Sequence, residues 1–172
     1  MDKHEPVEVV DAEMNGAAPS VTATELRRVL GHFATGVVIV SGIDRLGPVG
    51  LTCQSFFSLS LEPPLVALAP SHASTSWPRI AATGSFAVSI LSSAQETLGR
   101  TFAISGIDKF VGVPWRTAHT GSPIIEGALA WVDCRIEAVH QAGDHYLVVA
   151  RVVHAGHVDG RPLLFYRSGY VA

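Results

Sequence analysis

Lysine, charge of either sign and long apolar runs are all scarce in this chain. Only 16% of its 172 residues are charged, with 12 Lys and Arg against 15 Asp and Glu. The lysines are Lys3 and Lys109 alone, which leaves Schiff-base chemistry one plausible candidate. Without a concentrated basic face, nucleic acid is not an expected partner. No apolar stretch approaches the roughly 18 residues of a membrane-spanning helix, so no membrane association is expected either.

Cysteine is scarce as well, and the common catalytic and metal-binding motifs are missing. Cys53 and Cys134 lie far apart in apolar, strand-like segments, which indicates two reduced, buried thiols in a cytoplasmic protein. The sequence has no G-x-G-x-x-G, Walker, H-E-x-x-H or G-x-S-x-G motif. His154 and His157 lack a third ligand nearby in the sequence, so no metal site is expected. A bound dinucleotide would therefore have to be held without a Rossmann loop.

Apolar residues make up 48% of the chain, enough for one full-sized core, and the length predicts a single domain. Residues 1–20 are predicted to be a flexible acidic tail, because their acidic side chains are opposed by Lys3 alone. This tail has no basic segment followed by an apolar one, as a secretory signal would. The folded domain is predicted at residues 21–172. So little charge on so apolar a chain also predicts a homodimer.

Two capping boxes predict helices. The first, residues 22–25 (TATE), begins a helix in which Leu26, Val29, Leu30 and Phe33 recur at helical spacing. The second, residues 93–96 (SAQE), predicts a helix to about residue 103. A further short helix is expected at residues 74–83, and the glycine- and proline-rich residues 105–127 are interpreted as a long loop.

The remaining segments predict antiparallel strands. Phe57, Leu59 and Leu61 alternate with serines, the pattern of a half-buried strand, and Asp133 is expected on the polar face of a later strand. Regular turn signals favour an antiparallel barrel with a few short helices over a doubly wound sheet. The predicted strands are residues 37–40, 49–55, 57–61, 65–69, 86–91, 128–141, 146–153 and 162–166.

Four segments carry the functional signal, each with a plain structural alternative. Residues 50–65 (GLTCQSFFSLSLEPPL), in which hydroxyls and an amide lie on a strand that runs into Pro-Pro, would suit a flat heteroaromatic ring, or form the polar face of a half-buried strand. Residues 71–77 (SHASTSW) could hold a phosphate at a helix start, or simply cap that helix through Ser74 or Thr75. Residues 143–145 (GDH) form an ordinary turn in which His145 alone needs explaining. Residues 162–170 contain Tyr166 and Tyr170, which could pack on a ring system or close a dimer.

Taken in order, these and neighbouring segments resemble the short-chain flavin reductases, the reductase components of two-component flavin-dependent monooxygenases. The similarity extends from about residue 26 to residue 170 and looks closest to reductases that serve steroid- and phenol-type hydroxylases. Two departures are Ser89, where relatives often carry asparagine, and residues 71–72, where many carry a basic residue. The segments that carry the resemblance are residues 28–37 (RVLGHFATGV), 50–65 (GLTCQSFFSLSLEPPL), 84–91 (GSFAVSIL), 110–115 (FVGVPW), 127–130 (GALA), 143–145 (GDH) and 162–167 (PLLFYR).

The resemblance implies a split β-barrel that binds FMN, or alternatively FAD, with NADH as electron donor and NADPH as a second possibility. It implies that residues 52–55 border the flavin ring, that residues 74–77 lie near its phosphate, and that residues 143–145 receive the nicotinamide nucleotide. The predicted flavin contacts are Thr52, Cys53, Gln54, Ser55, Ser74, Thr75, Ser76, Ser89, Phe102 and Tyr166. The predicted nicotinamide contacts are Gly143, Asp144 and His145.

The function expected from this resemblance is hydride transfer from NADH to a loosely held flavin, which then leaves for a separate oxygenase. The two cofactors carry that chemistry, so no residue is expected to act covalently. One alternative is a flavin-binding module without turnover, against which the turn at residues 143–145 argues. Another is a split-barrel oxidase, whose phosphorylated substrate would call for several lysines and arginines, and this chain is poor in both.

Overall fold

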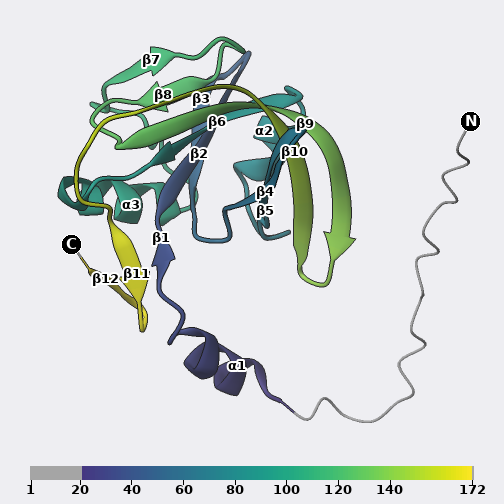
Figure 1. The fold of residues 1–172 in the computed structure, drawn as a ribbon, viewed down its shortest axis with the longest axis vertical. Coiled ribbons are helices and arrows are strands. Elements are labelled where there is room, and N and C mark those ends of the chain that lie inside the picture. The colour runs from purple at the N-terminus through teal and green to yellow at the C-terminus, as the bar shows by residue number, and fades with distance from the viewer. Residues whose placement is uncertain (1–20, 172) are drawn as a thin grey trace, which may run out of the picture.

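The computed structural model describes residues 21–171, and its main element is one seven-stranded antiparallel sheet (Figure 1). The sheet runs in the order β3-β2-β6-β9-β10-β5-β4. The two edge strands, β3 and β4, follow each other in the chain but do not pair, so the barrel stays open along one seam. Its strands are β2 (Val38–Asp44), β3 (Gly47–Cys53), β4 (Phe57–Leu61), β5 (Pro64–Leu68), β6 (Ser85–Ile90), β9 (Ala130–Ala142) and β10 (His145–His157).

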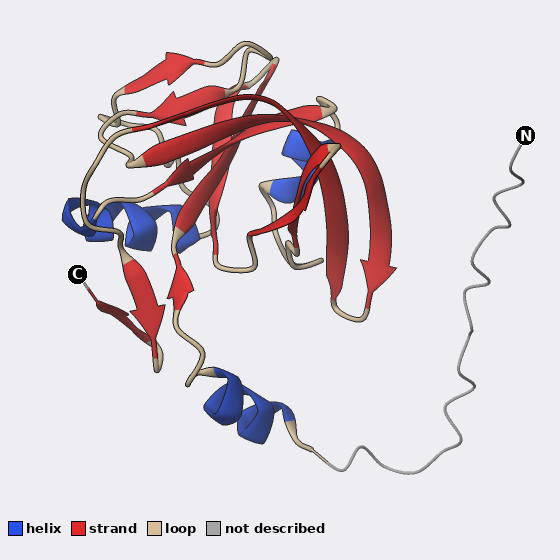
Figure 2. Cartoon of the chain, viewed as in Figure 1, coloured by secondary structure: helices blue, strands red, loops and turns tan. Residues whose placement is uncertain are grey.

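Short strands and helices surround this sheet (Figure 2). One small sheet joins strands from the two ends of the described chain, in the order β1-β11-β12, and a second is the β7–β8 hairpin. The helices are short throughout. These elements are α1 (Ala23–Leu30), β1 (Thr35–Gly36), α2 (Trp77–Ala81), the 3-10 turn η1 (Ser93–Gln95), α3 (Glu96–Ala103), β7 (Trp115–Thr117), β8 (Pro123–Ile125), β11 (Leu164–Tyr166) and β12 (Gly169–Val171).

The core divides into two main clusters, because β2 is buried on both faces. Val38 and Val40 join the larger cluster, to which α2 adds Trp77. Val37 and Ile39 project from the other face and pack in a second cluster with side chains from α3 and the loop after it. Alternate residues of a strand point to opposite faces, which explains why this β-branched run is apolar at every position. The second cluster holds α3 beside the end of β3.

The split barrel predicted from the sequence is confirmed, and seven of the eight predicted strands make up the seven-stranded sheet. Two short strands, β7 and β8, occupy part of the segment interpreted as a loop, and β12 was not predicted. These three strands have three residues each, and the two-residue β1 was not predicted either, because strands this short show no alternation pattern. The predicted tail, residues 1–20, lies outside the described residues. None of the described helices is long and apolar enough to cross a membrane.

The outer face of β9 differs from the sequence prediction at Asp133. This residue was expected among solvent-facing side chains, but it is fully buried. The loop between β7 and β8 covers it, and Thr120 donates to its carboxylate from the backbone nitrogen (2.8 Å) and from Oγ1 (2.6 Å). Consecutive burial of Asp133 and Cys134 accompanies an irregularity in the pairing with β10, between Val152 and His154.

The α1 helix confirms its capping box and leaves its apolar stripe uncovered. Thr22 accepts from the backbone nitrogen of Glu25, and the Glu25 carboxylate accepts from that of Thr22. No residue of α1 is buried, and Leu30 is 59% and the nearby Phe33 75% exposed. The helix ends at Leu30, before the Phe33 that the helical spacing had included, and its apolar stripe is exposed in the single chain.

Two other local predictions are shifted or wrong. The second capping box is made by Ser92 and Gln95, one residue earlier than the predicted Ser93 and Glu96, and it opens η1 before α3. Strand β4 was expected to be half buried, but Leu61 is 88% exposed. That strand is an edge of the open barrel, so it lacks a neighbour to cover its apolar side chains.

Candidate functional site

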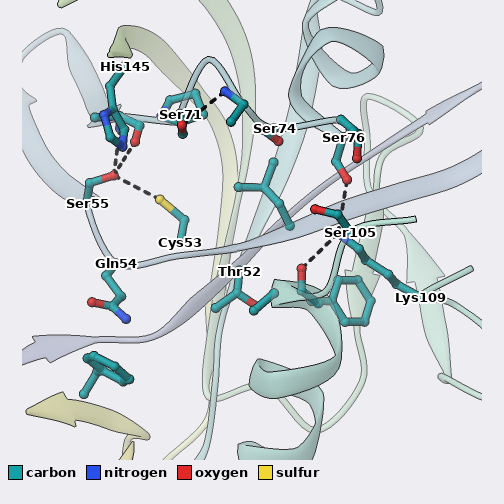
Figure 3. A pocket seen from close by; sticks show the side chains of 18 of the residues that line it. Thr52, Cys53, Gln54, Ser55, Ser71, Ser74, Ser76, Ser105, Lys109 and His145 are labelled. Carbon is teal, nitrogen blue, oxygen red and sulfur yellow. Dashed lines mark hydrogen bonds between the residues drawn. The ribbon is translucent and has the colours of Figure 1, made fainter. Parts of the chain in front are cut away.

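A pocket of about 800 Å³ opens beside the barrel seam (Figure 3). The end of β3 forms one wall, the loop from β5 to α2 another, and the end of α3 with the following loop a third. Apolar and hydroxyl-bearing side chains alternate around it, as in sites for flat heteroaromatic ligands. The lining residues are Leu51, Thr52, Cys53, Gln54, Ser55, Ala69, Pro70, Ser71, Ala73, Ser74, Thr75, Ser76, Phe102, Ala103, Ser105, Lys109, His145, Phe165 and Tyr170.

The wall formed by the end of β3 is held by its own hydroxyl groups. Thr52 Oγ1 donates to the carbonyl of Gly99 at 2.6 Å, which ties β3 to α3. Ser55 Oγ donates to the carbonyl of Ala69 at 3.0 Å and accepts from the Ala69 nitrogen at 2.9 Å. These bonds fix the wall and leave the exposed amide of Gln54 as the polar side chain on it that is free to meet a ligand.

Cys53 lines the same wall but is unsuited to nucleophilic chemistry. Its thiol is buried, and burial raises its pKa, because the charged thiolate is poorly solvated there. Its sulfur lies 3.1 Å from Ser55 Oγ. The thiol therefore stays neutral and acts as a small apolar contact.

The serine-rich wall differs from the predicted helix start. Helix α2 begins only at Trp77, and Ser74 Oγ accepts from the Trp77 nitrogen at 3.1 Å. Ser74 thus serves as a local cap, the structural alternative that the sequence left open. Ser76 makes no capping bond, and its hydroxyl instead accepts from Lys109 Nζ at 3.2 Å. Thr75 and Ser76 both line the pocket.

Lys109 is the cationic residue that the sequence analysis left out of the site. Its ammonium lies at the wall formed by the α3 end and bonds to β3, α3 and Ser76. Burial lowers its pKa, since desolvation disfavours the charged form. The only signal for Lys109 in the sequence was that lysine is rare in this chain. Lys109 stands in a loop far along the chain from the segments at residues 52–55, 71–77 and 143–145.

The turn at residues 143–145 reaches the pocket rim through His145. The tip of the β9–β10 hairpin docks on residues 70–72, where Asp144 accepts from the His72 nitrogen at 3.0 Å and Tyr146 donates to the Pro70 carbonyl at 2.9 Å. His145 Nδ1 lies 2.7 Å from Asp144 Oδ1, and this contact lowers the pKa of the Asp144 carboxyl. The ring of His145 is thereby oriented at the rim.

The structure gathers most of the predicted site residues around this one pocket and leaves four outside. Gly143 and Asp144 form the turn behind His145. Tyr166 does not line the pocket, whereas Tyr170 does, with Phe165 against it at a centroid distance of 5.2 Å. The predicted residues that line the pocket are Thr52, Cys53, Gln54, Ser55, Ser74, Thr75, Ser76, Phe102 and His145.

Ser89, one of the predicted flavin contacts, does not line the pocket. It is fully buried in β6, and its Oγ accepts from the Ile125 nitrogen at 3.0 Å. That bond joins β6 to β8, so the Ser89 hydroxyl has a structural partner and no access to the pocket. In the sequence, its position on an apolar strand was compatible with a flavin contact or with a structural hydrogen bond.

The chain's relatives agree with this architecture. The profile of the flavin reductase like domain matches residues 30–172. This chain belongs to the flavin reductase family. Among its relatives, the reductase subunit HsaB of a flavin-dependent monooxygenase from Mycobacterium tuberculosis is 46% identical over 147 residues, which cover 84% of this chain and 79% of that protein.

Two further members of the family extend the comparison. The FMN reductase (NADH) SmoA of Agrobacterium fabrum is 41% identical over 139 residues, 81% of this chain and 79% of its own length. The structure of the Streptomyces globisporus NADH:FAD oxidoreductase, in complex with NAD and FAD fragments, superposes with a TM-score of 0.82 at 35% identity. The matched region covers 87% of this chain and 91% of the Streptomyces chain.

The pocket fits a flavin by shape and donor set. Leu51 offers apolar surface for a ring, Gln54 offers an amide for the ring edge, and hydroxyls lie at the far wall. Within residues 21–171, no cluster of three or more His, Cys, Asp or Glu side chains could hold a metal ion.

Proposed function

We propose that this protein is an NADH-dependent flavin reductase that supplies reduced flavin to a separate flavin-dependent oxygenase. The observation that carries the proposal is the open pocket at the barrel seam, with polar residues of β3 on one side and His145 on its rim. Membership of the flavin reductase family supports it, as do relatives named as reductase subunits and NADH-dependent reductases. Its two free, buried thiols suit the cytoplasm, where we place the reaction.

The proposed arrangement puts the flavin ring against residues 52–55, on the wall that α3 supports from behind through the buried Phe102. The phosphate end then lies toward Thr75 and Ser76, and the nicotinamide approaches from His145. FMN is the flavin that we expect, in agreement with the name of the Agrobacterium relative. FAD is the alternative, in agreement with the Streptomyces structure.

When both are bound, the cofactors supply the chemistry, a hydride passing from nicotinamide to flavin. The protein orients the two rings and keeps them in contact, a contribution that needs no acid–base pair. His145 is a contact for the nicotinamide side and not a proton donor. Backbone N–H groups near residues 52–55 would stabilise negative charge that develops on the ring.

The deciding experiment is NADH oxidation by purified protein with and without added FMN, FAD or riboflavin. We expect turnover that saturates with added flavin, because the pocket is open and the flavin is exchanged as a substrate. NADPH in place of NADH is expected to give slower turnover. Flavin binding without oxidation of either nucleotide would refute the reductase and leave a binding module. Oxidation of a small substrate without nicotinamide would identify an oxidase instead.

Replacing His145 with alanine tests the nicotinamide contact. We expect the KM for NADH to rise by about 3- to 10-fold, because one hydrogen-bonding partner is worth about 1 kcal/mol. Steady-state kinetics at saturating FMN measure this change. His157→Ala is the matched control, an exposed histidine at the other end of β10. Unchanged KM and kcat in His145→Ala would remove His145 from the site.

We also propose a homodimer whose interface includes the apolar stripe of α1. Leu26, Leu30 and Phe33 line a second pocket of about 540 Å³. Gln54, Ser55 and Phe165 line both this pocket and the 800 Å³ pocket. A second copy seated here would cover exposed apolar surface and close the flavin pocket at its outer edge.

We infer that the reductase unit is residues 21–172, since the backbone nitrogen of Arg167 donates to the carbonyl of Gly31 and so ties the C-terminal strands to the end of α1.

Leu30→Asp is expected to dissociate this dimer. A carboxylate at the centre of an apolar interface raises the dimer Kd by roughly 30-fold or more, equivalent to at least about 2 kcal/mol. Sedimentation velocity across micromolar concentrations measures the shift. Leu61→Asp, on the 88% exposed leucine of edge strand β4, is the matched control and should remain dimeric. A wild-type protein that sediments as a monomer would overturn the proposal.

A further inference from the structure

The ammonium of Lys109 lies where three segments of the site meet (Figure 3). Nζ donates to the carbonyl of Gly50 on β3 and to that of Phe102 on α3, both at 3.0 Å. It also donates to the hydroxyl of Ser76 at 3.2 Å. The loop after α3 thereby holds a positive charge at the pocket wall, opposite the polar end of β3.

This charge has no carboxylate partner in the part of the chain that the structure describes. The ion pairs there are Arg79–Asp44, Arg100–Glu96, His145–Asp144 and Arg151–Glu137. The neighbouring Asp108 is turned away, and its Oδ1 accepts from the backbone nitrogen of Phe110 at 3.1 Å. A partly buried ammonium without a counter-ion is costly unless a ligand supplies the negative charge.

The surroundings of Lys109 are those of an anion site. It is the only lysine or arginine among the residues that line the 800 Å³ pocket, and it lies beside Thr75, Ser76 and Ser105. Because Ser76 Oγ accepts from Lys109, its own proton is free to point into the pocket and donate to a ligand. Residues 71–77 contain no lysine or arginine that could take this role.

We propose that Lys109 is the counter-ion for the flavin phosphate and makes this site select phosphorylated flavins over riboflavin. This inference rests on the proposed flavin reductase function. A phosphate oxygen within reach of both Lys109 and Ser76 would replace their mutual contact, the longest of the three that Nζ makes. Riboflavin carries no charge, so its binding would leave the ammonium uncompensated.

Flavin titration of the wild type, Lys109→Met and Lys109→Arg tests this inference, with FMN and riboflavin followed by flavin fluorescence. The wild type is expected to bind FMN at least about 10-fold more tightly than riboflavin. Lys109→Met should lose roughly 10- to 100-fold in FMN affinity, the range for a hydrogen bond to a charged group, with little change for riboflavin. Lys109→Arg, which keeps the charge, should restore most of the preference.

Arg116→Met is the control, because Arg116 lies over the ring of Trp131, outside the pocket. It removes one positive charge and should leave the ratio of the two flavin affinities unchanged. A measurement on the wild type alone guards against a Lys109→Met protein that does not fold. Its FMN affinity should fall about threefold or more between about 0.05 and 0.5 M sodium chloride, while riboflavin affinity stays constant.

The outcomes separate this inference from the function on which it rests. Equal FMN and riboflavin affinities in the wild type, or equal losses for both flavins in Lys109→Met, would overturn the role of Lys109 while leaving the reductase intact. A wild-type protein that neither binds flavin nor oxidises NADH in its presence would overturn the reductase itself.

Discussion

Replacing Phe102 with alanine is expected to lower the free energy of unfolding by about 3–5 kcal/mol. Phe102 is fully buried at the end of α3, where its ring meets that of Phe110 at a centroid distance of 5.0 Å. It also lies against Gly50 so closely that a Cβ there would come within 2.7 Å of the ring. No flexible neighbour lies at that contact to fill the resulting cavity, since β3 offers only the glycine backbone.

Thermal and denaturant unfolding measure this loss, which corresponds to roughly 6–20 °C in Tm for a chain of this size. Phe57→Ala is the matched control, because Phe57 is 48% exposed on edge strand β4. It should cost less than about 1.5 kcal/mol. Equal losses in the two variants would show that the second core cluster does not anchor α3. Because Phe102 also lines the pocket, its loss should weaken flavin binding as well.

Ala103→Trp is expected to reduce kcat/KM for the flavin by at least about 100-fold. Ala103 ends α3, is exposed, and lines the pocket next to Phe102. An indole there would occupy space proposed for the flavin, and forcing two groups into one volume costs roughly 3 kcal/mol. The rate of NADH oxidation as a function of FMN concentration measures the effect.

Ala155→Trp provides the control for Ala103→Trp. Ala155 is exposed on β10 and does not line the pocket, so turnover should stay within about twofold of wild type. Circular dichroism and melting of both variants check that each folds. Undiminished turnover in a folded Ala103→Trp protein would mean that the flavin does not enter this pocket, and would contradict the proposed site.

The pocket that these variants test opens at one structural feature, the unpaired seam between β3 and β4. Residues 54–56 cross from one edge strand to the other, and a closed barrel would have covered this segment with hydrogen-bonded neighbours. Because the seam stays open, Gln54 and the hydroxyls of the β5–α2 loop face a common space. An open site of this kind suits a protein that must admit flavin and release it reduced.

The sequence predicted the site segments better than the individual contacts. Residues 52–55, 74–76 and 145 meet at one pocket, as their order in the family pattern indicated. Ser89 and Tyr166 do not line this pocket, because a strand residue has two faces and sequence alone does not say which one a neighbouring hairpin will cover. Lys109 was missed because its role depends on α3 turning back onto β3, a contact between residues 59 apart in sequence.

Local chemistry in the sequence determined the antiparallel barrel and the capped helices. These features depend on periodicity, caps and turns, which act over a few residues and so can be read along the chain. The tertiary structure alone decided that Asp133 is buried, that the α1 stripe is exposed and that Lys109 lines the pocket. Each depends on which distant segment covers which side chain, and that follows from packing of the whole chain.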